Sequence, residues 1–220
     1  MIILVNFLLL IKKVSNYNKE IIDKGLTPQN IYKLCSCIRE TFCLSYSIRK
    51  DNNLLFYFQK EHILIYFTGN ELRYLGPDER SQALLLEKAI KKANKTDFKV
   101  RDGRKQSTPG IYALKFLDHP SFLGYINSLV IRNVYFIIDQ EEFIKKESNI
   151  YAGNINCEFY QDRNLFIIPT YDIFNGNSKI FDLIREMKNI KFFSLSKIKQ
   201  IENKILYINY LNDHQDPVRL

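Results

Sequence analysis

A basic side chain, Arg80, lies where a helix is predicted to begin. Residues 76–80 read Gly-Pro-Asp-Glu-Arg and precede an apolar-periodic run, a pattern typical of a helix start. Arg80 lies in the first turn, where the helix dipole favours negative charge rather than positive. We therefore expect Arg80 either to pair with Asp78 or Glu79, or to contact a phosphate or another part of a substrate.

Two hydroxyl side chains precede a predicted tight turn. Ser107 and Thr108 stand directly before Pro109-Gly110, and Pro-Gly is typical of the central positions of a type II turn. Side-chain hydroxyls can bond to the backbone or to a ligand. Both remain candidates for binding at this hairpin.

The cysteines and His62 do not suggest metal or acid–base chemistry. Cys35, Cys37, Cys43 and Cys157 lack the spacing of metal ligands, and no histidine is near them in sequence. We expect no metal site and read the cysteines as reduced and structural, which indicates the cytoplasm. His62 is expected at an exposed strand end rather than in the role of a catalytic base.

The charge balance leaves two interpretations open. The chain has 220 residues, enough for one substantial core, and 32 basic against 24 acidic side chains give a formal net charge of +8. Such a surplus favours a polyanionic partner, most often nucleic acid. It is equally consistent with a solvated lysine surface.

The apolar N-terminus predicts a buried strand. Residues 1–11 are too few to span a bilayer, which needs about 20, and they lack the basic start and cleavage site of a secretory signal. No other segment is predicted to cross a membrane.

The periodicity predicts strands that alternate with helices. Strands are expected at 1–10, 54–58, 62–67, 111–116, 133–138, 165–168 and 191–195. Helices are expected from Thr27 as N-cap with Pro28 as the first helical residue, from Gly76-Pro77, over 121–131, from Ser178 to Met187, and from Ser196 to about 212. Residues 139–164 have no clean period and are expected to form an irregular, exposed connection. The whole chain is predicted to be one α/β domain with a largely parallel sheet.

Several ordered motifs resemble one enzyme family. They read Leu-Cys-Ser-Cys at 34–37, Ser-Tyr-Ser-Ile-Arg-Lys-Asp at 45–51, Phe-Thr-Gly-Asn-Glu-Leu at 67–72, Pro-Asp-Glu-Arg at 77–80 and Ser-Thr-Pro-Gly-Ile-Tyr at 107–112. In order and spacing they are similar to the archaeal tRNA T-loop pseudouridine N1-methyltransferases of the SPOUT class. The resemblance runs from about 34 to 116 and resumes more weakly at 133–138, 165–168 and 193–205.

This resemblance implies a fold, a cofactor and an assembly. The fold would be a SPOUT-like Rossmannoid α/β sheet with a deep trefoil knot at its C-terminal end. S-adenosylmethionine would bind in the knotted loops, and the active site would form across a homodimer. By correspondence with the family, the cofactor-binding positions would be Ile137, Pro169, Ser194, Leu195, Ser196 and Ile198.

The resemblance is weakest at the cofactor end. Where the family has a glycine that opens a loop, this chain has Pro169. Proline removes a backbone donor and fixes φ, so the loop would have to be rebuilt.

Three functions are compatible with these residues. The first is methyl transfer from S-adenosylmethionine to N1 of pseudouridine 54 in tRNA, with an RNA-facing or dimer-facing wall. That wall would consist of Arg49, Asp51, Arg80, Ser107 and Thr108. Three lysines, Lys191, Lys197 and Lys199, would add affinity for phosphate. The second is an RNA-binding dimer of the same fold that has lost the cofactor, and the third is a SPOUT methyltransferase with another RNA substrate. Arg49 and Asp51 could instead form a corner ion pair, worth about 0–1 kcal/mol.

Overall fold

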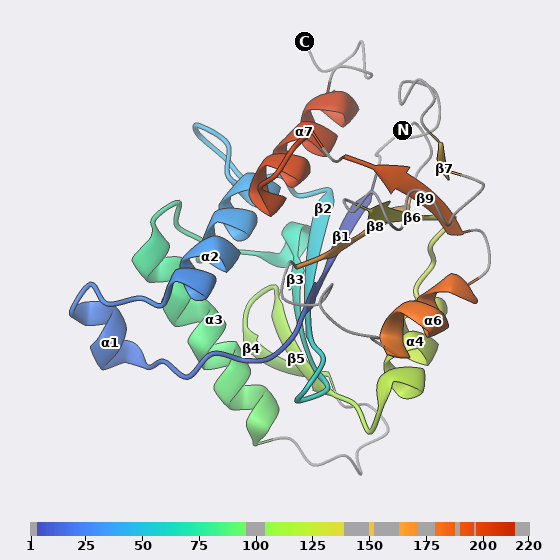
Figure 1. The fold of residues 1–220 in the computed structure, drawn as a ribbon. Helices are drawn as coiled ribbons and strands as arrows, with labels where there is room; N and C mark the ends of the chain where they lie inside the picture. Colours follow the sequence, from blue (N-terminus) through green and yellow to red (C-terminus); the bar gives the residue numbers. More distant parts are fainter. Residues whose placement is uncertain are drawn as a thin grey trace.

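One mixed sheet organises the molecule (Figure 1). The computed structural model describes residues 4–95, 104–138, 150–151, 163–170, 179–187, 190–195 and 197–213. The described strands follow the order β4-β5-β3-β2-β1-β8-β6-β9-β7. The neighbouring strands β2, β1, β8, β6, β9 and β7 run parallel to one another. On the other side of β2, the strands β3, β5 and β4 continue the sheet in antiparallel pairing. The sequence-based prediction of a largely parallel α/β sheet is confirmed.

Seven of the nine described strands agree closely with the predicted ones, whereas β4 and β7 were not predicted. The strand bounds are β1 Val5–Ile11, β2 Asn52–Phe58, β3 Ile63–Thr68, β4 Lys105–Thr108, β5 Ile111–Lys115, β6 Asn133–Ile138, β7 Ile150–Tyr151, β8 Asn164–Pro169 and β9 Ile190–Ser194. Two details correct the expected irregular connection over 139–164. Residues 150–151 form a short strand, and Asn164 already begins β8; residues 139–149 and 152–162 lie outside the described part.

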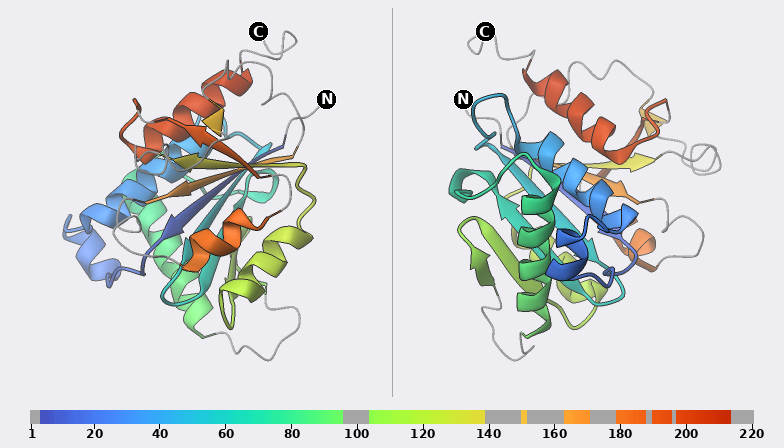
Figure 2. Two further views of the ribbon diagram at one scale, coloured as in Figure 1. Left: turned by 45° about the vertical axis from the view of Figure 1, so that its right-hand side comes forward. Right: turned by 90° about the vertical axis from the view of Figure 1, so that its left-hand side faces the viewer.

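Helices cover both faces of the sheet (Figures 1 and 2). On one face lie α1 (Lys19–Asp23), α2 (Gln29–Phe42), α3 (Glu79–Asn94) and α7 (Ile201–Asp213), and on the other lie α4 (His119–Ser128) and α6 (Lys179–Arg185). Strand β1 shows the consequence for the sequence. Phe7 and Leu9 belong to the core on the α2 side, whereas Leu8 and Leu10 belong to the core on the α4 side. Burial on both faces explains why this strand has a continuous apolar run rather than an alternating one.

A row of asparagines crosses the sheet at the amino ends of its parallel strands. Asn53 of β2 donates to Asn6 of β1 (2.9 Å), and Asn6 donates to the backbone oxygen of Asn164 in β8 (3.0 Å). Asn133 of β6 donates to the Asn164 side chain (3.1 Å). Buried amides cost free energy unless their hydrogen bonds are made, so the row ties four strands together in one register.

Two predicted helix starts are wrong by one or two residues. Helix α2 begins at Gln29 with Pro28 as its N-cap and no side-chain cap, so Thr27 does not cap it. Helix α3 begins at Glu79 with Asp78 as N-cap, so Gly76-Pro77 precede the helix. Pro28 has φ −58° and ψ 141°, an extended backbone that suits proline as well as the first helical position does.

The other predicted helices lie close to the observed ones. Helix α4 begins and ends earlier than the predicted 121–131 and is capped by Asp118. Ser178 and Ser196, where the last two helices were expected to begin, lie outside the described residues. Residues 197–200 are not helical and α7 begins at Ile201, so the predicted start of the last helix is wrong.

The described cysteines agree with the prediction that they are reduced and structural. Cys35 and Cys37 are free and buried in α2, and Cys43 is free and half-buried at its C-terminus. Burial raises the pKa of the Cys35 thiol to about 12, which keeps it in the unreactive thiol form. Cys157 lies outside the described residues.

The corrected cap can be tested by substitution. Asp78 accepts a hydrogen bond from the Ser81 backbone N–H at 2.8 Å, so Asp78→Ala should destabilise the protein by about 1 kcal/mol. Thr27→Ala should change stability by less than about 0.5 kcal/mol. Hydrogen bonds from Ser81 lower the pKa of Asp78, so the cap stabilises fully above the unfolded aspartate pKa of about 3.9 and is lost as pH falls further. Urea unfolding at neutral and acid pH measures both; equal effects of the two substitutions would contradict this cap assignment.

Candidate functional site

The carboxyl ends of β8, β6 and β9 meet at one edge of the sheet. Ile137 pairs with Phe193, and Ile138 pairs with Ser194, so the ends of β6 and β9 lie side by side. Pro169 ends β8, the neighbour of β6 on its other side. The structure thus brings together three segments that the resemblance assigned to the cofactor. In open α/β sheets, this edge is where ligands bind.

Strands β6 and β8 stop pairing with each other before either one ends. Their last pair is Phe136 with Ile167, whereas β6 pairs on with β9 and β8 pairs on with β1 as far as Pro169. Because the two strands separate at their carboxyl ends, their backbone N–H and C=O groups are available there to other partners. Such a parting resembles the crevice in which α/β sheets bind ligands.

Pro169 fits this parting without breaking the strand. Thr170 N donates to Leu10 O of β1 at 2.9 Å, and because alternate residues of a strand face the same neighbour, Pro169 N faces β6. Pairing with β6 has already ended there, so the missing N–H removes no ladder bond. The expectation that proline ends the strand at 168 is wrong, since β8 includes Pro169; the loop at 171–178 lies outside the described residues.

The segment after β9 turns back at once. Ile198 N donates to Leu195 O at 2.9 Å, and Leu195 is buried while Lys197 is exposed between them.

After β8, the side-chain oxygen Thr170 Oγ1 is buried and has no hydrogen-bond partner among the described residues. Thr170 was not predicted as a site residue, although its position directly after a parallel strand could have indicated it. Ser196 lies outside the described residues.

Four of the predicted substrate-binding residues lie at the opposite edge of the sheet, whereas Lys197 follows β9 at the cofactor edge. Arg49 and Asp51 precede β2, at its amino end. Ser107 and Thr108 end β4, which runs antiparallel to β5, and the Gly110 carbonyl accepts a bond from Thr68 N, opposite Asn53 of β2. All four residues therefore lie at the amino edge of the parallel strands, opposite the edge that holds Pro169 and Ser194.

Arg49 has a different ion-pair partner from the one considered. Its guanidinium donates two bonds of 2.6 Å to Asp213 at the end of α7. Asn52 supports the same junction by donating to Asn209 of α7 at 2.9 Å. These contacts hold α7 against the start of β2.

Arg80 pairs across helices rather than within its own. Its guanidinium donates to Asp23 of α1, with a shortest distance of 2.6 Å. Neither Asp78 nor Glu79 is this partner. The side chains are 60% and 38% exposed, so the pair contributes at most about 1 kcal/mol and leaves one face of Arg80 accessible to a ligand.

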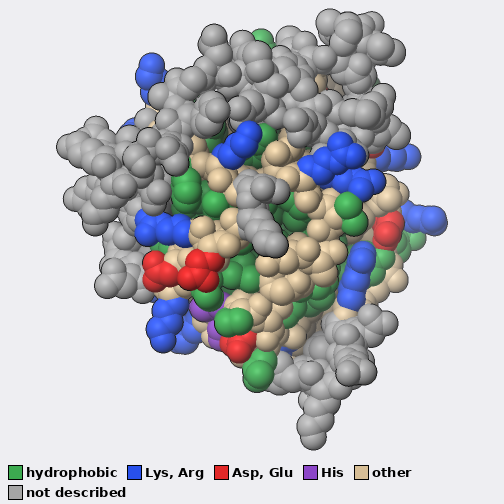
Figure 3. Space-filling model, turned by 90° about the vertical axis from the view of Figure 1, so that its right-hand side faces the viewer, with side chains coloured by type: hydrophobic (Ala, Val, Ile, Leu, Met, Phe, Trp, Pro, Cys, Tyr) green, Lys and Arg blue, Asp and Glu red, His purple; other side chains and the backbone are tan. Residues whose placement is uncertain are grey.

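A histidine pair that sequence analysis did not recognise lies on the α4 side of the sheet. The Tyr57 hydroxyl lies 3.1 Å from His62 Nδ1 and 2.8 Å from His119 Nδ1, and the two imidazoles are 4.8 Å apart. His62 is thus half-buried in a hydrogen-bonded cluster rather than free at a strand end. Burial, followed by repulsion from His62, lowers the pKa of His119. Figure 3 shows the histidines at the surface beside acidic side chains.

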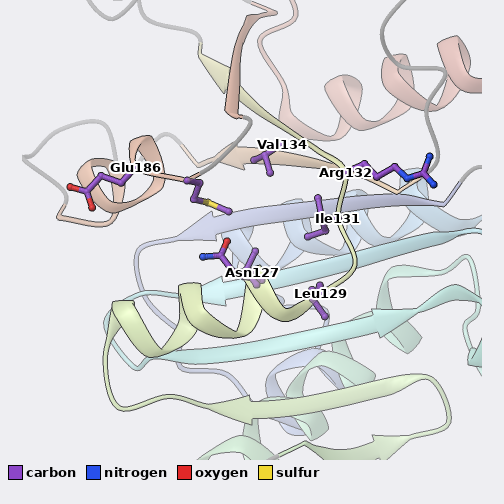
Figure 4. Close-up of a pocket in the computed structure, with 8 residues that line it drawn as sticks. Asn127, Leu129, Ile131, Arg132, Val134 and Glu186 are labelled. Atoms are coloured by element: carbon purple, nitrogen blue, oxygen red, sulfur yellow. The ribbon is translucent and has the colours of Figure 1, made fainter.

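The lining of one cavity is mixed, with five apolar and three polar or charged residues. The cavity measures about 450 Å³ and lies between the ends of α4 and α6, lined by Ile126, Asn127, Leu129, Ile131, Arg132, Val134, Glu186 and Met187. In Figure 4 the guanidinium of Arg132 and the carboxylate of Glu186 point away from it. Its polar groups therefore do not converge as those of a catalytic site do.

Among the described residues, no three or more histidine, cysteine or acidic side chains are placed to hold a metal ion. None of the described helices is long and apolar enough to cross a membrane.

Comparison with known proteins identifies relatives for most of the chain. Residues 29–116 match a family described as "Putative SAM-dependent RNA methyltransferase". A tRNA (pseudouridine(54)-N(1))-methyltransferase of Methanocaldococcus jannaschii is 34% identical over 130 residues, 57% of this chain and 54% of the relative. The enzyme of that name from Methanococcus maripaludis strain C6 is 33% identical over 167 residues, 69% of this chain and 80% of the relative.

The similarity extends to the fold. The chain spans about half the length of the first curated relatives it matches, 54% and 52%. It spans 70% of another relative of that name, from Methanococcus aeolicus, at 36% identity. The crystal structure of Archaeoglobus fulgidus Nep1 bound to S-adenosylhomocysteine superposes with a TM-score of 0.54 over 98% of this chain and 99% of that one, at 12% identity. The architecture is therefore a SPOUT-like α/β fold. The chain belongs to the family of tRNA (pseudouridine(54)-N(1))-methyltransferases.

Proposed function

We propose that this chain transfers a methyl group from S-adenosylmethionine to N1 of pseudouridine 54 in the T-loop of tRNA. The observation that carries the proposal is the meeting of the three predicted cofactor segments at one edge of the sheet, where β6 and β8 part. Family membership supports the choice of substrate. The formal net charge of +8 is consistent with a polyanionic partner.

The residues at this edge fit the cofactor. Ile137 and Leu195 are buried apolar side chains that can exclude water from a ligand, and the unpartnered Thr170 Oγ1 offers a donor and an acceptor. The parted strands leave backbone groups that can bind an adenine whatever the side chains are. When bound, S-adenosylmethionine supplies an electrophilic methyl group on a sulfonium.

The contribution of the chain is then positioning. N1–H of pseudouridine is an imide-like acid, so a positioned acceptor can take its proton while the base is held in line with the methyl group. Rate acceleration from orientation alone is large when the reacting atoms are held in near-attack geometry. The carboxyl edge holds the donor side, and the predicted wall with Ser107 and Thr108 would hold the RNA.

We also propose a homodimer and a C-terminal trefoil knot. In one chain the cofactor edge and the Ser107–Thr108 hairpin lie at opposite edges of the sheet. A second copy can bring its hairpin to the cofactor edge of the first, which supports an active site shared between protomers. For the knot, the support is the SPOUT-like architecture, in which β9 lies beyond β6 rather than beside β8.

The proposal can be tested with two measurements on the purified chain. Calorimetric titration with S-adenosylmethionine should show binding with one site per chain. Methyl transfer should occur to a T-arm RNA hairpin with pseudouridine at position 54, whereas the same hairpin with uridine there should stay unmodified, since uridine has no N1–H. Absence of binding at high micromolar cofactor, or equal methylation of both RNAs, would reject the function.

A further inference from the structure

A small polar pocket lies beside the β4–β5 hairpin. It measures about 360 Å³ and is lined by Asn70, Glu71, Arg73, Gln106, Pro109 and Gly110. This volume is at the lower end of the range for ligand pockets, about 300–1,000 Å³. The pocket lies at the amino edge of the sheet, away from the proposed cofactor edge of the same chain.

The pocket carries the groups that read the edges of nucleobases. Asn70 and Gln106 are exposed amides, each with donors and an acceptor in one plane. Arg73 adds a planar donor and Glu71 a carboxylate acceptor. Amides, arginine and acidic groups are the side chains that pair with base edges, and RNA-binding proteins use them on unstacked bases.

A stacking surface adjoins this pocket. Strand register places Gln106, Tyr112 and Tyr66 opposite one another across β4, β5 and β3, on one face of the sheet. The Arg104 guanidinium carbon lies 3.6 Å from the centre of the half-buried Tyr112 ring and 5.3 Å from that of Tyr66. Aromatic rings and arginine planes are the surfaces on which unpaired bases stack.

The two features form one continuous surface. The Tyr112 hydroxyl donates to the Glu71 carboxylate, which also lines the pocket. This bond raises the pKa of Tyr112 and fixes its ring next to Gln106. A base in the pocket would therefore meet polar groups on its edge and the Tyr112–Arg104 stack beside it.

We propose that the pocket and the Tyr112–Arg104 stack bind one unstacked base of the RNA substrate. This inference rests on the proposed function in one respect, that the substrate is RNA. It adds to that function a base-recognition site on the β4–β5 hairpin, next to Ser107 and Thr108 of the proposed RNA-facing wall. The site would hold a base that the loop of a T-arm exposes and a paired stem does not.

Binding of RNA by substituted proteins tests the proposal. The probes are a T-arm RNA hairpin and a blunt RNA duplex of equal length, measured by fluorescence anisotropy. The double variant Asn70→Ala, Gln106→Ala and the variant Tyr112→Leu should each bind the hairpin at least about tenfold more weakly. Tyr112→Phe, which keeps the ring, should stay within about threefold of the wild type. Tyr32→Ala, at an exposed tyrosine of α2 on the other face of the sheet, is the matched control.

The outcomes separate this site from the proposed function. In methyl transfer, the loss should appear as a raised KM for RNA, with S-adenosylmethionine affinity unchanged. Variants that bind the hairpin as the Tyr32→Ala control does, or a wild type that binds hairpin and duplex equally, would overturn the site while methyl transfer stands. A wild type that binds the hairpin through this surface but transfers no methyl group would reject the function and leave the site. A wild type that binds no RNA overturns both.

Discussion

Mixing two inactive variants of this chain is expected to restore methyl transfer. The first variant, Ser194→Arg, places a long cation at the end of β9, where the cofactor is proposed to bind. The second, Ser107→Glu, adds negative charge to the hairpin proposed to face RNA, where it would repel phosphates. Each homodimer should be inactive because every site contains one altered edge.

Recovery follows from the geometry of the two edges. Ser194 and Ser107 lie at opposite edges of one sheet, so an active site that needs both must combine two chains. In a two-fold symmetric dimer, random exchange makes half of the dimers mixed, and each mixed dimer has one site with both edges intact. After unfolding and refolding of an equimolar mixture, activity should return to about a quarter of the wild-type rate.

The controls make the result decisive. Each variant must keep a cooperative thermal transition close to that of the wild type. Where Ser107→Glu does not fold, Gln106→Glu at the exposed neighbouring position replaces it. An equimolar mixture of folded variants that stays inactive would show that both edges serve the same protomer's site, or that no dimer forms.

The sequence predicted the sheet well because strand signals are local. The continuous apolar runs of β1 and β8 reflect burial on both faces, and β6 was predicted with its observed bounds. The hairpin turn at Pro109-Gly110 also follows from local chemistry, since glycine allows the positive φ that the turn requires.

What the sequence did not reveal depends on side chains from distant segments. Arg49 could be given a neighbour such as Asp51, but its partner Asp213 is 164 residues away. The asparagine row and the Tyr57–His62–His119 cluster have the same origin, because each needs the strand order that only the fold supplies. The separation of the two candidate site edges is likewise a property of topology, since a list of site residues does not show which edge each one occupies.

Replacing Gly110 by alanine is expected to destabilise the protein strongly. Gly110 has φ +79°, and an added Cβ would lie 2.5 Å from Leu72 N and 2.7 Å from Leu72 Cα. The left-handed backbone costs an alanine about 1–2 kcal/mol, and contact with rigid backbone of the 69–72 segment adds to it. We expect a total loss of about 3 kcal/mol, which lowers Tm by roughly 6–12 °C in a chain of this size.

Two other glycines separate the causes of this loss. Gly25 has φ +70° but nothing within 4 Å of an added Cβ, so Gly25→Ala should show the conformational cost alone. Gly124 lies within α4 with open space around it, so Gly124→Ala should stabilise by up to about 1 kcal/mol through helix propensity. Urea unfolding of the three variants measures the conformational cost, the cost of contact with Leu72 and the gain in helix propensity. If Gly110→Ala were no more destabilising than Gly25→Ala, the hairpin would not pack against Leu72, and the pocket beside it would lose the wall on which base recognition depends.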